Sequence, residues 1–312
     1  MAGRPLPAHG AGLVEELLGQ CCFPPSGTAV DCAFSGGADS TALVVLAAAA
    51  GCTVTAIHVD HGLHPGSSAA AADAASLADQ LDVAFRVLRV NIADGPNLEA
   101  RAREARWAAL PAGALRGHTA DDRAETVLIN LLRGSGLAGL GAMGPSPFRP
   151  LLALRRSETA AVCAALGLRT VDDPTNEDRR FVRNRVRAEL VPLMADIAGR
   201  DIVPILDRTA GLLAADLDLL DADGSDLDPA DARALAGAPP ALARRALRRW
   251  LTTGGLPPDL ASVDRVLEVA RGNVVACEIT GGRRVERHGQ RLRIVERRPV
   301  RSAADDGTLG AS

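Results

Sequence analysis

The first half of the chain alternates short apolar runs with longer runs of helical periodicity. Stretches rich in Val, Ala and Ile predict strands at residues 28–34, 53–60, 83–90 and 114–118. Helices are predicted between and after them, at about 40–50, 66–81, 97–110 and 121–133. Because the strands lack polar alternation, they are typical of a parallel sheet covered on both faces. The pattern therefore predicts an α/β fold with a doubly wound parallel sheet, whose ligands bind beyond the carboxyl ends of the strands.

The second half of the chain is mainly helical. Helices are predicted at residues 155–166, 177–198, 203–221, 229–236, 239–253 and 259–271. Residues 273–296 predict three short strands, because Gly in "TGGR" and "RHGQ" suits tight hairpin turns. We therefore expect a first domain at 1–204, a smaller, mainly helical domain with short C-terminal strands at 205–298, and a disordered tail at 299–312.

Composition favours a cytoplasmic protein without a membrane partner. The chain has 312 residues, of which 47% are hydrophobic, but its longest apolar run, 41–50, is about half of the ~20 residues that a spanning helix needs. The early residues show no apolar segment typical of a secretory signal. Six cysteines form no CxxC pair, which indicates reduced thiols in a cytosolic protein.

All 35 basic residues are Arg, since the sequence contains no Lys. A Walker A lysine, a pyridoxal Schiff base and a lysyl-adenylate ligase intermediate are therefore excluded. The net charge is only −3, but the charge is uneven: residues 241–301 carry 14 Arg against 6 acids, and residues 199–240 carry 3 Arg against 9 acids. The basic part is either a working surface for an anionic partner or an ordinary solvated face.

"SGGADS", residues 35–40, follows the first predicted strand and opens a helix. Adjacent glycines let backbone N–H groups approach an anion, serines add donors, and the helix N-terminus favours negative charge. Asp39 would repel a phosphate unless it caps the helix or meets a metal ion. A simple strand-to-helix turn is the alternative.

Polar residues also follow the second and third predicted strands. "HVDHGLHPGSS" begins at His58 and favours a nucleotide-facing rim over a metal site or structural packing. Arg103 and Arg106 share one helical face. Two such guanidinium groups can fork onto phosphates, or simply form ion pairs on a surface helix.

The fourth strand end, "GHTADDRAET", gathers His118, Asp121, Asp122 and Glu125 where a helix begins. Acids in a first helical turn are normal partners of the helix dipole. Asp122 and Glu125 are three residues apart, however, and can face one cationic ligand or Mg²⁺. "GSGLAG" at 134–139 fits a dinucleotide fingerprint, but it follows a helix and is rejected.

Two further segments carry arginines in functional-looking settings. "FRPLL" places Arg149 in an apolar loop, and residues 171–193 include Arg179, Arg180, Arg183, Arg185 and Arg187. This density fits contact with an RNA backbone. The alternative is a helix tied to its own acids.

The order of these motifs resembles the PP-loop N-type ATP pyrophosphatases, and within them the tRNA(Ile)-lysidine synthetase family. The matching blocks are "AFSGGADST", "HVDHGL", "NLEARAREARW", "GHTADDRAETVLINLLRGSGLAGL", "RPLL" and "DDPTNEDRRFVRNRVR", which together span roughly residues 30–190. The resemblance makes 1–204 a PP-loop ATP-binding catalytic domain and 205–298 a tRNA-binding domain. It implies that ATP adenylates C2–O of the wobble cytidine in a CAU-anticodon tRNA(Ile), and that the ε-amine of L-lysine then displaces AMP.

The resemblance also implies a set of roles. ATP would contact Ser35, Gly36, Gly37, Ala38, Asp39, Ser40, His58 and Arg103. Asp39, Arg106 and His118 would be catalytic, with Mg²⁺ on Asp39. Asp122 and Glu125 would bind lysine. The tRNA would contact Arg149, Arg183, Arg185, Arg187, Arg245 and Arg249. A homodimer is left open as a further partnership.

Three residues depart from the family pattern: Arg123 stands where Gln is usual, Trp107 where Tyr is usual, and His64 where Arg is common. Arg123 is expected to pair with Asp122 and so to alter the lysine pocket. Three other functions are weighed against the main one. These are a PP-loop tRNA thiolase, a glutamine-dependent amidating ligase, and a catalytically silent nucleotide-binding regulator.

Overall fold

A computed structural model describes residues 8–60, 62, 67–90, 101, 105, 107–171, 178–223, 226–252, 258–279 and 282–296. The chain divides into two compact units, Met1–Ala214 and Ala215–Ser312. The boundary falls inside helix α10 (Val203–Asp223). The expected tail at 299–312 lies outside the described residues.

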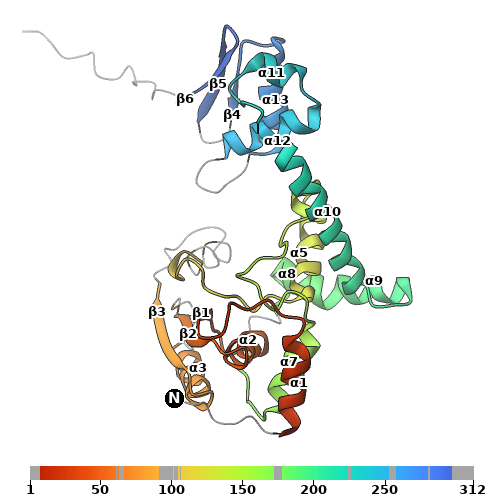
Figure 1. Cartoon of the computed structure of the whole chain (residues 1–312). Helices are drawn as coiled ribbons and strands as arrows, with labels where there is room; N and C mark the ends of the chain where they lie inside the picture. The colour runs from red at the N-terminus through yellow and green to blue at the C-terminus, as the bar shows by residue number, and fades with distance from the viewer. Residues whose placement is uncertain are drawn as a thin grey trace, which may run out of the picture. The chain divides into compact units, whose positions relative to one another are not determined.

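The first unit is built on three parallel strands in the order β1 (Ala29–Ala33), β2 (Thr53–Asp60) and β3 (Ala84–Arg89). The expected parallel sheet is therefore confirmed. Helix α2 (Ala38–Ala49) packs on β1 and β2, and α3 (Ser67–Gln80) packs on β2 and β3 (Figure 1). Helix α1 (Ala8–Leu18), which the sequence pattern does not predict, packs with α2 and α7 (Arg156–Ala165).

Both faces of the central strand β2 are buried, whereas β3 is largely exposed. Val54 and Ala56 of β2 join the core beneath α2, whereas Ile57 and Val59 join a second cluster on the other face. The second cluster includes Trp107 and Leu110. Double-sided burial explains why the strands read as continuous apolar runs.

The strand predicted at 114–118 is reduced to one parallel bridge, between Cys32 and Leu115. Leu115 exchanges backbone hydrogen bonds with β1, but the Arg116 N–H donates to the carbonyl of Phe148 (2.9 Å). The ladder stops because the chain turns away toward Gly117, which lies against the backbone of Asp39. A full fourth strand is therefore wrong for this segment.

The remaining helices of the first unit bring the later motifs to the sheet. They are α5 (Ala120–Leu132), α6 (Leu137–Leu140), and a continuous helical run made of α8 (Val182–Arg185), a π-helical turn (Val186–Leu190) and α9 (Val191–Ala198). This run confirms most of the helix predicted at 177–198. A π-helical turn is rare and is frequently found at functional sites.

The second unit packs helices against a small antiparallel sheet. Its helices are α11 (Ala232–Gly237), α12 (Pro240–Leu251) and α13 (Leu260–Arg271). Its strands, β4 (Ala276–Ile279), β5 (Arg283–His288) and β6 (Arg291–Glu296), pair in sequence order. Both the helices and the three short strands agree with the sequence pattern. Nowhere in the described part of the chain is a helix long and apolar enough to cross a membrane.

Candidate functional site

The turn after β1 presents backbone amides and hydroxyls at the carboxyl edge of the sheet. Gly36 adopts φ 85°, a conformation that favours glycine. The Ser35 and Ser40 hydroxyls lie 3.1 Å apart, and that of Ser40 donates to the Gly37 carbonyl (2.9 Å). Gly37 caps α2 without a side-chain hydrogen bond. The N-cap side chain therefore does not occupy the first backbone N–H groups of α2. Such N–H groups at a helix N-terminus can bind an anion.

Asp39 is held in the first turn of α2 by contacts from α7. Its carboxylate accepts hydrogen bonds from the Thr159 hydroxyl and from Arg156 Nε (3.4 Å). Burial raises the pKa of Asp39, and the bonds from Thr159 and Arg156 offset this only in part. A Cβ on Gly117 would lie 2.6 Å from the Asp39 carbonyl oxygen, so only glycine lets this segment approach the first turn of α2.

Asp122 and Glu125 face the same arginine, as their spacing predicts. Arg156 donates from Nη2 to Asp122 (3.1 Å) and from Nη1 to Glu125 (2.9 Å). Arg183 reaches both carboxylates, at 3.4 and 3.3 Å. Arg187 Nε donates to Glu125 at 2.7 Å. Asp39, Asp122 and Glu125, which we call the acid cluster, are thus matched by three guanidinium groups.

Burial is deepest at Glu125, whose side chain is 2% exposed. Asp122 accepts from both the backbone N–H (3.0 Å) and the hydroxyl (3.1 Å) of Thr119, so it also caps α5. Burial by itself would raise the pKa of Asp122. The charges of Arg156 and His118, with the Thr119 bond, outweigh that effect and hold the pKa below its usual value.

Two arginines at the start of α7 belong to the site but were not among the predicted site residues. Arg156 joins all three members of the acid cluster, and Arg155 pairs with Asp121 at 3.0 Å. The motif "RRSE", two residues after "RPLL", could have indicated them. Two arginines at the start of a helix interact unfavourably with the helix dipole, so they need acidic partners.

Two histidines predicted for the site lie near the sheet edge. His58 is buried at the end of β2, with Nδ1 3.1 Å from the Phe34 carbonyl. The His118 ring lies 5.7 Å from the ring of Trp107, and its charge acts on Asp122. Arg103, Arg106 and His64 lie outside the described residues.

The expected pairing of Arg123 with Asp122 is wrong. Arg123 instead donates from Nη1 to Asp207 (2.7 Å) and from Nε to the Met143 carbonyl (3.0 Å). The reason is helical geometry: consecutive residues point about 100° apart, so Arg123 leaves the face that carries Asp122 and Glu125.

The arginines predicted to contact tRNA fall into three settings, of which one is the loop where Arg149 Nη1 donates to the Gly144 carbonyl (3.4 Å). Arg183 and Arg187 point to the acid cluster, while Arg185 pairs with Glu189 (3.2 Å). In the second unit, Arg245 and Arg249 reach Asp221 from α12, through its carboxylate (3.1 Å) and its carbonyl (3.3 Å) respectively.

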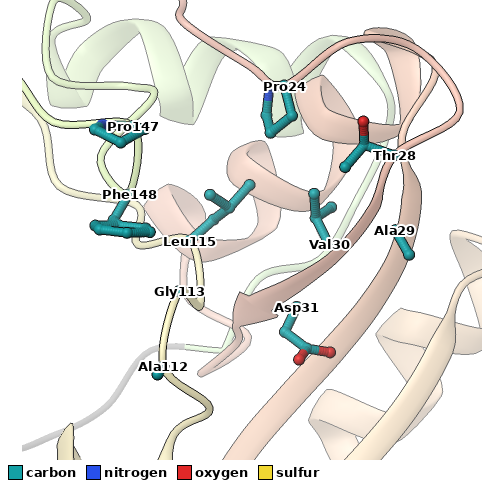
Figure 2. A pocket seen from close by; sticks show the side chains of 10 residues that line it. All are labelled: Pro24, Thr28, Ala29, Val30, Asp31, Ala112, Gly113, Leu115, Pro147 and Phe148. Carbon is teal, nitrogen blue, oxygen red and sulfur yellow. The ribbon is translucent and has the colours of Figure 1, made fainter.

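A separate cavity of about 250 Å³ lies at the opposite end of β1. Figure 2 shows Pro147 and Phe148 on one side of it and Thr28 and Ala29 on the other. The wall includes Asp31, at mid-strand. Because ligands of such sheets bind at the carboxyl ends, this cavity is not the candidate site. Within the described ranges, no three His, Cys, Asp or Glu side chains are grouped as metal ligands.

Comparison with known proteins agrees with this geometry. A family model described as a PP-loop domain matches residues 14–194, and one described as a TilS substrate binding domain matches residues 231–293. The chain is 44% identical to the tRNA(Ile)-lysidine synthase of Nocardia farcinica, over 90% of this chain and 96% of that protein. It is 40% identical to the tRNA(Ile)-lysidine synthase of Mycobacterium tuberculosis, over 85% and 90%.

Among solved structures, the chain is similar to a U34-tRNA thiolase from Methanococcus maripaludis. The TM-score is 0.50 at 16% identity, over 69% of this chain and 85% of that one. This likeness shows the shared fold alone. The sequence matches and the family models are more specific, and they show that the chain belongs to the tRNA(Ile)-lysidine synthase family.

Proposed function

We propose that this chain ligates L-lysine to C2 of the wobble cytidine in tRNA(Ile) with a CAU anticodon, converting ATP to AMP and pyrophosphate in the cytoplasm. The observation that carries the proposal is Arg156, which bonds at once to Asp39 of the phosphate-seating turn and to Asp122 and Glu125. A seat for an anion and a seat for a cation therefore adjoin, as ATP cleavage followed by attack of an amine requires.

In the adenylation half, residues 35–40 hold the phosphates. The amides of Gly36, Gly37 and Ala38 and the hydroxyls of Ser35 and Ser40 stabilise charge as it develops on pyrophosphate. Ala38 and Asp39 belong to the first turn of α2, where the helix dipole adds to the same effect. Arg103 and His58 complete the ATP contacts in this proposal.

Mg²⁺ fits the chemistry of this turn, since a carboxylate oxygen is a ligand that it prefers. Asp39 would hold it, and the ion would neutralise phosphate charge. Because burial raises the pKa of Asp39, a nearby cation would also favour its ionised form. Arg106 would clamp the phosphate or the adenylated base.

In the ligation half, Asp122 and Glu125 bind the cationic lysine. Both carboxylates already carry guanidinium groups, so lysine binding is an exchange of cations. The lysine ammonium has no lone pair with which to attack C2, so it must first lose a proton. His118, in its neutral form, accepts that proton. The tRNA backbone contacts Arg149, Arg183, Arg185, Arg187, Arg245 and Arg249. A homodimer stays a prediction.

The deciding experiment supplies ATP, labelled lysine and unmodified tRNA(Ile) with the CAU anticodon, and measures label in the tRNA. Label is expected only with this tRNA and this amino acid. Equal labelling of tRNA(Met), or equal transfer of other amino acids, would contradict the proposed specificity.

Asp39→Ala tests the phosphate-seating turn in the same assay. It is expected to abolish pyrophosphate release with tRNA and lysine present. Asp31→Ala is the matched control, because Asp31 lies in β1 at the cavity away from the turn. A fully active Asp39→Ala enzyme would refute the metal and phosphate role.

A further inference from the structure

Three arginines of the first unit come together at one turn, apart from the acid cluster. Arg123 Nε donates to the Met143 carbonyl (3.0 Å) and Arg149 Nη1 to the next carbonyl, that of Gly144 (3.4 Å). The backbone N–H of Arg116 bonds to Phe148, the residue before Arg149. We call Arg116, Arg123 and Arg149 the arginine cluster.

Each member of the arginine cluster keeps a buried nitrogen that no described group accepts from. These are Nε of Arg116, Nη2 of Arg123 and Nε of Arg149. The residue Arg123 is only 5% exposed. A buried donor without an acceptor destabilises the fold, and it does so more strongly when it belongs to a charged group. Binding of a ligand that supplies acceptors would remove this cost.

The cluster also lacks balancing negative charge. Within the described part of the chain, its one ion pair is that of Arg123 with Asp207 (2.7 Å). Burial and the like charges of Arg116 and Arg123 lower the pKa of Arg149. Three neighbouring arginines whose charges act on one another, with one carboxylate among their partners, are typical of a seat for an anion.

The turn that gathers the cluster is itself strained. Met143 has φ 61°, a left-handed conformation that a non-glycine residue rarely adopts. Such strain persists where the surroundings impose it and is common at ligand-binding positions.

We propose that Arg116, Arg123 and Arg149 bind a phosphate of the RNA backbone near the nucleotide that is modified. The inference rests on the proposed function, which makes tRNA the substrate. Phosphate oxygens match the fork of a guanidinium group and accept several of its donors at once. ATP already has its seat at residues 35–40, so a second phosphate seat suits the other phosphate-bearing substrate.

The surroundings of the cluster fit a single-stranded RNA loop. Phe148, next to Arg149 and on the wall of the cavity away from the phosphate turn, is 45% exposed and offers an aromatic face for a base further along the strand. The Arg116 guanidinium lies 4.2 Å from the Trp107 ring centroid, and that ring contacts His118. The cluster is therefore linked through Trp107 to the predicted proton acceptor, which places the bound strand beside the reacting groups.

The test measures tRNA affinity without ATP or lysine, over a series of salt concentrations, for Arg149→Gln and Arg116→Gln. Each variant is expected to raise the Kd about tenfold and to reduce the slope of log K against log salt by about 0.7, the value for one contact to a single strand. Arg86→Gln is the matched control, an exposed arginine of β3, and should leave Kd and slope unchanged. Arg123→Gln is added, with a thermal melt to show that it folds.

Unchanged tRNA affinity and slope in Arg149→Gln and Arg116→Gln would overturn the proposal. So would a higher KM for ATP or for lysine at unchanged tRNA Kd, which would assign the cluster to ATP phosphates or to the lysine carboxylate. The two proposals fail separately. A wild-type chain that binds tRNA without attaching lysine refutes the proposed function, whereas normal lysine transfer with normal binding by the variants refutes the arginine cluster alone.

Discussion

Glu125→Gln should destabilise the first unit, whatever it does to activity. The Glu125 side chain is 2% exposed and accepts from Arg156 (2.9 Å) and Arg187 (2.7 Å). Glutamine keeps the volume but removes the charge, so these guanidinium groups lose a buried counter-ion. Removing one partner of a buried ion pair costs about 3–5 kcal/mol.

The loss at this site should be smaller than that general figure. Arg156 and Arg187 are 26% and 34% exposed, so both can turn toward water. Asp122 also remains as a partner for Arg156. We therefore expect a loss of about 2–3 kcal/mol in the free energy of unfolding. For a unit of 214 residues, this corresponds to a fall in Tm of about 4–12 °C.

Tryptophan fluorescence measures this unit by itself. The chain has two Trp, Trp107 in the first unit and Trp250 in the second, so Trp250→Phe leaves one reporter for the unit that holds Glu125. In this background, urea unfolding of Glu125→Gln is compared with that of Glu189→Gln, which alters a more exposed carboxylate. The double variant Glu125→Gln/Arg187→Gln should recover part of the loss, because it removes both partners. An unchanged or higher midpoint for Glu125→Gln would refute the charge argument.

Four further predictions concern the first unit. Asp122→Asn should destabilise the protein at neutral pH, and this effect should diminish as the pH falls through the lowered pKa of Asp122, because a carboxylate with a lowered pKa stabilises the folded state only while it is ionised. Asp39→Asn should cost less at neutral pH, since its raised pKa means that ionisation opposes folding there; paired melts at pH 7 and pH 3 check both signs, and equal losses at both pH values would contradict them. Gly117→Ala should lower kcat for pyrophosphate release and cost about 1–3 kcal/mol by overpacking, because its Cβ would lie 2.6 Å from the Asp39 carbonyl oxygen; a normal rate would show that the contact relaxes freely. Iodoacetamide at pH 8 should label exposed Cys22 and spare Cys163, whose thiol pKa burial raises to about 11; mass spectrometry of the digest checks this, and rapid labelling of Cys163 would contradict the protection of this thiol by burial.

The strands and helices were predictable because their burial is simple. Residues 53–60 form β2 with the predicted bounds, and buried parallel strands are continuous apolar runs. The length of the strand predicted at 114–118 was overestimated, and the reason is local. Apolar composition gives no information on the approach of Gly117 to Asp39, which turns the chain away after one bridge.

The shared face of Asp122 and Glu125 was predictable from their spacing, but their ion-pair partners were not. Spacing alone indicates that Asp122 and Glu125 share a helical face, and the structure confirms it. Which cation lies between them depends on α7, which packs against α2 from more than 100 residues further along the chain. No local pattern specifies that Arg156 fills this place, or that Arg123 turns to Asp207.

If the acid cluster binds lysine as proposed, charge balance indicates which arginine would leave it. The acid cluster has three carboxylates against three guanidinium groups, so an incoming ammonium leaves an excess positive charge unless one arginine departs. Arg156 is the least free to leave, because it bonds to all three carboxylates. Arg187 is the most exposed of the three, at 34%, and depends mainly on Glu125. A phosphate of the bound tRNA would accept it at little cost, so binding of the RNA and entry of the amino acid should favour each other.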